Sequence, residues 1–137
     1  MTALILAKAG LWLFLAGLLI GVAIPKFTSP RLALSAHLTA VQSGTTLLAI
    51  GWFWPQLTQG NACANLLGSA LWISFWMLTG GLTLAAAWGA SHVLPIAGAG
   101  YRATPIRERV TSVVILAASV TMILTLGALL TISTLSS

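Results

Sequence analysis

The sequence predicts an all-α protein, an integral membrane bundle of four transmembrane helices forming one domain over residues 1–137. Of its residues, 58% are hydrophobic and only 5% are charged, whereas about a quarter of a soluble domain is charged. The mean hydropathy is +1.03. Four apolar stretches reach the roughly 20 residues that a membrane-spanning helix needs. The expected surroundings of the chain are therefore a lipid bilayer.

Each predicted helix is bounded by residues that interrupt helices. The predicted helices cover residues 3–24, 32–54, 63–90 and 110–135. Pro25 ends the first, Pro55 ends the second, and the turn around Gly60 precedes the third. The first stretch lacks the basic start and the cleavage site of a signal peptide, so we expect it to be retained.

The basic residues predict the topology. Lys26 and Arg31 lie in or beside the first loop, and three arginines lie in or beside the third, at positions 102, 107 and 109. The positive-inside rule then places both loops in the cytoplasm of a bacterial inner membrane. Because these charges would meet lipid headgroups, the net charge of +5 does not indicate a nucleic-acid partner.

The remaining distinctive residues have structural interpretations. Four tryptophans near helix ends are expected in the interfacial aromatic belt: Trp12, Trp52, Trp54 and Trp88. The single cysteine, Cys63, excludes an intramolecular disulfide and is expected to be a small buried residue. The only carboxylate, Glu108, is expected to complement a helix N-terminus and pair with a flanking arginine.

Most catalytic chemistries are excluded by this inventory. One carboxylate cannot form the acid pair of a glycosidase or an aspartic protease. Without an aspartate there is no Ser-His-Asp set, and no phosphate-binding glycine motif is present. His37 is the one histidine within a predicted helix, and a histidine inside a membrane commonly has a partner or a function.

Two interpretations of His37 stay open. Ala40, Val41, Gly44 and Leu48 share its helix face within about 60°. This smooth strip suits a flat macrocycle that rests on Gly44 while His37 ligates its metal. It equally suits a helix-packing face on which His37 bonds a neighbouring backbone.

The third predicted helix has two unlike faces. A polar and aromatic stripe comprises Asn65, Ser69, Trp72, Trp76, Thr79 and Thr83. The opposite face comprises Leu67, Ala70, Ser74, Leu78, Gly81 and Ala85. The stripe indicates either interhelical hydrogen bonds or a pocket for an aromatic ligand, and the face that meets the core stays open. Counted from the helix ends, Ser43 and Ser74 share one depth, with Trp76 about 3 Å further along.

The order of several of these residues resembles that of a known enzyme family. The order Ala36-His37, Ser43-Gly44, Pro55, Leu66 to Ser69, and Trp76 with Gly80 resembles styrene oxide isomerase, a small four-helix membrane enzyme. The run from Trp88 to Tyr101 looks more like its relative, hydroxylaminobenzene mutase. The resemblance implies haem b, a homotrimer, and haem at a subunit interface with iron bound by the residue at the position of His37.

The resemblance also guides the expected reaction. The family positions for an Asn, an Asp and a Tyr of the epoxide pocket are here Ser43, Ser74 and Leu82, so a different substrate is expected. We expect the conversion of an aryl hydroxylamine to an ortho-aminophenol, with ferric haem b as Lewis acid. His37 would ligate the iron, Ser43 and Ser74 would orient the hydroxyl, and Trp76 would stack on the aryl ring.

Other interpretations remain. Arg31 and Lys26 would pair with haem propionates or serve only as topology anchors. An epoxide-to-aldehyde isomerase on the same haem scaffold is one alternative function. A non-enzymatic haem carrier, or a structural bundle, is another.

Overall fold

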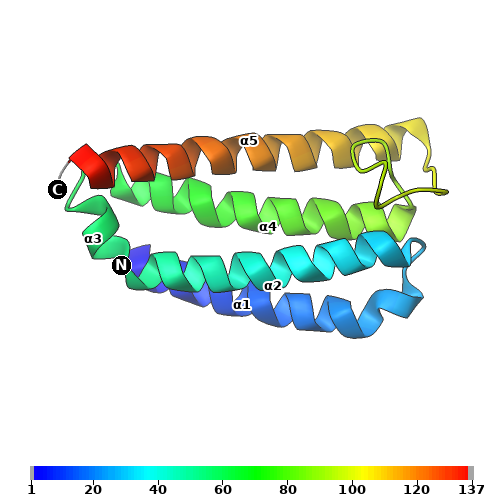
Figure 1. Ribbon diagram of the computed structural model, residues 1–137, viewed down its shortest axis with the longest axis horizontal. Coiled ribbons are helices and arrows are strands. Elements are labelled where there is room, and N and C mark those ends of the chain that lie inside the picture. Colours follow the sequence, from blue (N-terminus) through cyan, green and yellow to red (C-terminus); the bar gives the residue numbers. More distant parts are fainter. Residues whose placement is uncertain (1, 136–137) are drawn as a thin grey trace.

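The computed structural model describes residues 2–135, and all its regular structure is helical. The elements in order are α1 (Thr2–Ala23), the short 3₁₀ helix η1 (Ile24–Lys26), α2 (Pro30–Trp52), α3 (Trp54–Thr58), α4 (Ala64–Trp88) and α5 (Pro105–Leu135). The four long helices lie side by side, with α1 beside α2 and α4 beside α5 (Figure 1). The α1–α2 and α4–α5 connections lie at one end, and the short α3 lies at the other.

Within the described residues, three helical segments are long and apolar enough to cross a membrane. They are Thr2–Lys26, Ala64–Trp88 and Pro105–Leu135. This composition is compatible with a membrane protein. The fourth expected span, α2, is long enough at 23 residues, but it is less apolar because hydroxyl and amide side chains interrupt its sequence.

Two helix boundaries differ from those that the sequence predicts. Helix α2 ends at Trp52, and helical structure resumes at Trp54 instead of stopping at Pro55. Pro55 lies in the first turn of α3, where its missing N–H has no intrahelical partner to lose. Helix α3 ends at Thr58 and is followed by Gln59, whose φ of 46° is left-handed. Similarly, α5 begins at Pro105, earlier than the predicted residue 110.

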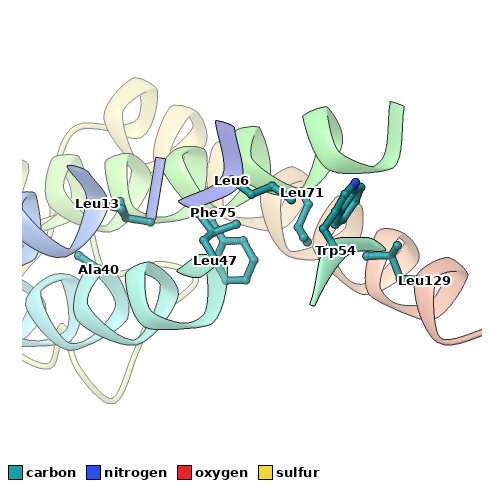
Figure 2. Packing of buried hydrophobic residues seen from close by; sticks show 8 residues of the cluster. All are labelled: Leu6, Leu13, Ala40, Leu47, Trp54, Leu71, Phe75 and Leu129. Carbon is teal, nitrogen blue, oxygen red and sulfur yellow. The ribbon is translucent and has the colours of Figure 1, made fainter. Parts of the chain in front are cut away.

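The apolar core contains residues from every long helix (Figure 2). One cluster comprises Leu6, Leu13, Ala40, Leu47, Trp54, Leu71, Phe75 and Leu129. Trp54 is only 5% exposed, so the prediction that it belongs to the interfacial belt is wrong. Placing its indole in the cluster removes a large apolar surface from solvent. Trp12 and Trp52 are exposed, and Arg107 lies 5.4 Å from the ring centre of Trp88.

Two further expectations are corrected at the connections. Cys63 is exposed beside the turn before α4, not buried. Glu108 lies in the first turn of α5, as predicted, but it forms no ion pair within residues 2–135; its carboxylate accepts backbone N–H bonds from Ser91, His92 and Ala103, at 3.1, 2.9 and 2.9 Å. The local geometry of the loop supplies these donors, which sequence alone does not reveal.

The α1–α2 connection is fastened to the end of α4. The Ser29 N–H donates to the Ala86 carbonyl at 3.0 Å, and the Thr28 hydroxyl donates to the Ala87 carbonyl at 2.8 Å. These bonds hold the start of α2 beside the C-terminal end of α4. The first turns of α2, which lead to His37, therefore have a fixed position relative to α4.

Candidate functional site

The contact between α1 and α2 is built on glycines. A Cβ atom on Gly10 would lie 2.7 Å from the Gly44 carbonyl oxygen. A Cβ atom on Gly44 would lie 2.7 Å from the Phe14 backbone nitrogen. Both distances are shorter than any real Cβ contact, so only glycine lets the two backbones approach this closely. Small residues serve this purpose where membrane helices pack.

His37 lies on the same face of α2 and reaches across to α1. Its Nδ1 lies 2.7 Å from the Gly17 carbonyl oxygen. A carbonyl oxygen can only accept, so Nδ1 carries the proton and donates it. In a neutral imidazole the lone pair then belongs to Nε2. A backbone carbonyl bonded to one ring nitrogen is the usual arrangement that orients a histidine for metal binding through the other.

Gly21 makes room for this imidazole. A Cβ atom there would lie 2.8 Å from Nδ1 and 2.9 Å from Cε1 of His37. Gly17 and Gly21 are one turn apart on α1, and both contact the His37 ring, Gly17 through its carbonyl and Gly21 by leaving space for the ring. Their contact with His37 is not predicted by the sequence. The available signal was the glycine spacing at positions 10, 17 and 21, which places all three on one face of a helix.

The strip beside His37 packs on α1. A Cβ atom on Gly17 would meet the side chains of Ala40 and Val41 at 2.9 and 3.0 Å. Gly44 lies against Gly10 and Phe14, as described above. Gly44 therefore serves the α1–α2 contact, which is the packing interpretation of this face. Its predicted contact with a macrocycle stays a prediction.

Ser43 and Ser74 both lie in the protein interior. They are 4% and 1% exposed. The cluster in Figure 2 includes Ala40 and Leu47 on either side of Ser43 along the chain, and Leu71 and Phe75 on either side of Ser74. This shared cluster agrees with similar depths for the two serines. The Ser74 hydroxyl donates to the Leu71 carbonyl at 2.8 Å, which leaves its oxygen able to accept another bond.

Trp76 is not brought together with the serines. It is 36% exposed, whereas Ser74, on the opposite face of α4, is buried. The face of α4 with small residues meets α5, because a Cβ atom on Gly81 would lie 2.9 Å from the Ile115 side chain. The small-residue face of α4 is therefore the one that meets the core.

Near the N-terminal end of α4, Asn65, Ser69 and Trp72 help line a cavity of about 200 Å³.

One residue of the polar stripe turns inward. Thr79 is buried, and its hydroxyl has no hydrogen-bond partner within residues 2–135. It lies between Phe75 of one core cluster and Leu82 of the other. The Ser29 N–H bonds the Ala86 carbonyl and α2 and α4 run in opposite directions, so Thr79, seven residues before Ala86, lies close to the depth of His37, eight residues after Ser29. An unpaired buried hydroxyl is costly, which makes Thr79 a candidate to bind a ligand.

The outward face of α2 is unexpectedly polar. Gln42 is exposed near the middle of this 23-residue helix, and its side-chain amide makes no hydrogen bond to any described residue. Arg31 is also exposed, near the start of α2, and a helical wheel places it within about 20° of Gln42. Gln42 is not among the predicted site residues, although an amide at the centre of a predicted span is a signal that the sequence contains.

The donor set restricts the kind of metal site. No cluster of three or more His, Cys, Asp and Glu side chains exists in the part of the chain that the structure describes. A metal on His37 would therefore need most of its ligands from another molecule, as haem provides from its porphyrin. The half-buried imidazole, with Nδ1 already bonded to Gly17, fits that requirement.

Comparisons with known proteins add a family. The family model described as styrene oxide isomerase matches residues 2–133. Hydroxylaminobenzene mutase HabB of Ectopseudomonas oleovorans is 36% identical over 122 residues, covering 86% of this chain and 73% of that protein. Hydroxylaminobenzene mutase HabA of the same organism is 36% identical over 115 residues, covering 78% and 80%. No solved structure matches the chain.

Proposed function

This chain belongs to the styrene oxide isomerase family and is an isomerase, and from this premise we propose that it converts an aryl hydroxylamine, such as hydroxylaminobenzene, to an ortho-aminophenol. The names of both relatives support this substrate class. The reaction moves oxygen from nitrogen to the ortho carbon and a proton from that carbon to nitrogen. It therefore needs no external oxidant or reductant.

The observation that carries the proposal is the oriented histidine. The Nδ1–Gly17 hydrogen bond of 2.7 Å fixes the ring, and the missing side chain at Gly21 leaves space for it. We infer that His37 binds the iron of haem b through Nε2. When bound, ferric haem supplies the Lewis acid that polarises the oxygen leaving nitrogen.

Arg31 could reach the edge of a macrocycle bound by His37. It lies six residues, or about 9 Å, from His37 toward the loop, and a helical wheel places it about 120° around α2 from that residue. The Arg31 guanidinium makes no hydrogen bond or ion pair within residues 2–135, so it is available to a propionate. Lys26, also exposed, could serve a second propionate from the adjoining connection.

The protein side chains would bind and orient the substrate. Ser43, Ser74 and Thr79 are buried hydroxyls on α2 and α4, and we propose that they hold the migrating hydroxyl. Their burial excludes bulk water, which would otherwise compete for the electrophilic ring. Trp76 could stabilise positive charge on an aryl ring through its π face. Because it faces outward, it would do so across a subunit interface.

A homotrimer with haem at the subunit interface fits the exposed polar groups. An unpaired amide is costly in contact with hydrocarbon, and Gln42 lies at the centre of α2. Covering this face with another copy of the chain would let α2 serve as the fourth membrane span. The basic connections at one end would then face the cytoplasm of a bacterial inner membrane.

The experiment is a product assay on the purified, haem-supplemented protein. Incubation with phenylhydroxylamine should yield 2-aminophenol, identified by chromatography. Styrene oxide is the essential comparison, because the family model carries the description styrene oxide isomerase. Conversion of styrene oxide to its aldehyde without turnover of phenylhydroxylamine would replace the proposal with the epoxide alternative.

A further inference from the structure

A second cavity lies away from the proposed haem site. Its volume is about 740 Å³, and it is lined by the α4–α5 connection and the first turns of α5. No residue of α1 or α2 lines it, so it is separate from His37 and its partner glycines. Its polar residues include His92, Arg102, Arg109 and Ser112.

The charged groups of this cavity favour an anion. The guanidinium groups of Arg102 and Arg109 form no hydrogen bond or ion pair with any described residue. Glu108 also lines the cavity, but three backbone N–H groups already bond its carboxylate. The arginines are therefore free to bind a ligand.

Ser112 provides an independent observation. Its Oγ is buried and has no hydrogen-bond partner within residues 2–135, although the residue lines the cavity. An unpaired buried hydroxyl costs free energy, which rotation of the Ser112 side chain toward a ligand oxygen would recover. Two arginines and a hydroxyl donor match the oxygens of a phosphate group.

Further along α5 from these polar groups, the cavity is lined by apolar side chains. Val113 and Leu116 follow on the same side of α5 and are 59% and 53% exposed. Arg109, Ser112, Val113 and Leu116 have the spacing that places residues on one helix face. The face thus leads from cations at the helix start to apolar side chains further along a membrane-spanning candidate.

We propose that this cavity binds the phosphate headgroup of an anionic phospholipid, with its acyl chain lying along Val113 and Leu116. Free phosphate shares the headgroup chemistry but does not need the apolar part. The cationic end of the molecule supports a lipid, because basic pockets between membrane helices attract anionic headgroups. This site is independent of the proposed haem chemistry.

The test uses native mass spectrometry of the full-length protein in detergent with phosphatidylglycerol or phosphatidylcholine added. The proposal predicts retained phosphatidylglycerol, and at least about tenfold weaker binding in Arg102→Gln/Arg109→Gln. Arg107→Gln is the matched control, because Arg107 lies over Trp88 and does not line the cavity. Its binding should change by less than about threefold.

Three results would overturn the proposal. The first is equal loss in the Arg107 control, which would indicate general surface attraction. The second is equal retention of phosphatidylcholine. The third is displacement of the lipid by millimolar inorganic phosphate together with full binding in Leu116→Gln, which would assign the cavity to free phosphate. Size-exclusion chromatography of each variant confirms that it is folded.

Discussion

At the level of single residues, the central feature is how α1 holds His37. One carbonyl, from Gly17, fixes the ring nitrogen that carries the proton. One missing side chain, at Gly21, leaves the space that the ring occupies. Together they fix both the tautomer and the position of the only histidine in a long helix of residues 2–135, which is what a metal ligand needs.

Gly21→Ala tests this arrangement. The new Cβ would lie 2.8 Å from Nδ1, so the ring must shift and the bond to Gly17 should weaken. We expect a loss of about 1–3 kcal/mol of stability and an altered environment of His37. Thermal unfolding measures the first, and ¹⁵N NMR of the imidazole in haem-free protein measures the second. Gly127→Ala is the control, since a Cβ there meets nothing within 4 Å; an unchanged imidazole spectrum in Gly21→Ala would contradict the assignment.

Thr79→Val separates a functional role from a structural one. The Thr79 hydroxyl is buried without a partner, so its replacement by a methyl group should leave stability unchanged or raise it by up to about 1 kcal/mol. If the hydroxyl binds substrate, turnover should fall by about tenfold or more. Steady-state kinetics and thermal unfolding on the same sample make the comparison. Full activity would remove Thr79 from the proposed site.

The sequence predicts some of this site and misses the rest for a physical reason. His37 stands out because so few polar groups share its apolar surroundings. The depth match of Ser43 and Ser74 follows from helix rise alone. Gly17 and Gly21 could not be assigned, because their contact with His37 depends on how α1 and α2 are rotated and shifted against each other. Only the packed pair of helices reveals that.

At the level of helices, α1 and α2 form a unit through direct backbone contact. Glycine in a helix interior lowers intrinsic stability, so several glycines on one face indicate that close packing outweighs this cost. The contact also holds His37 against α1. The helix order is readable from sequence, but the α2–α3 junction is not, since Pro55 suits either a helix end or a first turn.

Gly44→Ala should separate these helices. Its Cβ would lie 2.7 Å from the Phe14 nitrogen and 2.8 Å from the Gly10 carbonyl oxygen, and backbone atoms cannot move aside as a flexible side chain can. We expect about 1–3 kcal/mol of destabilisation, measured by thermal unfolding in detergent. Gly80→Ala is the control on α4, because a Cβ there meets nothing within 4 Å. Equal stability of the two variants would refute the packing role.

For the whole molecule, the polar outer face of α2 is the main clue to assembly. Three long helical segments have the composition of membrane spans, whereas α2 exposes Gln42 at its centre. A single copy in lipid would leave this amide unpaired. The proposed homotrimer would cover it and would bring the outward Trp76 against another copy.

Gln42→Leu tests the assembly. If Gln42 lies in a subunit interface, the substitution removes a polar contact. The variant trimer should then dissociate at protein concentrations at which the wild-type trimer stays intact. A face that met only lipid would be stabilised by leucine instead. Native mass spectrometry at a series of concentrations measures the three-copy fraction. A wild-type protein that remains monomeric throughout would contradict the proposed homotrimer.

The central claim, that His37 is the haem ligand, is tested most directly by the absorption spectrum of the purified protein after haem supplementation, with His37→Ala beside it. We predict an intense Soret band in the wild type that is lost or strongly shifted in His37→Ala, while Gly127→Ala retains it. No Soret band in the folded wild type, or an identical band in His37→Ala, would contradict the claim.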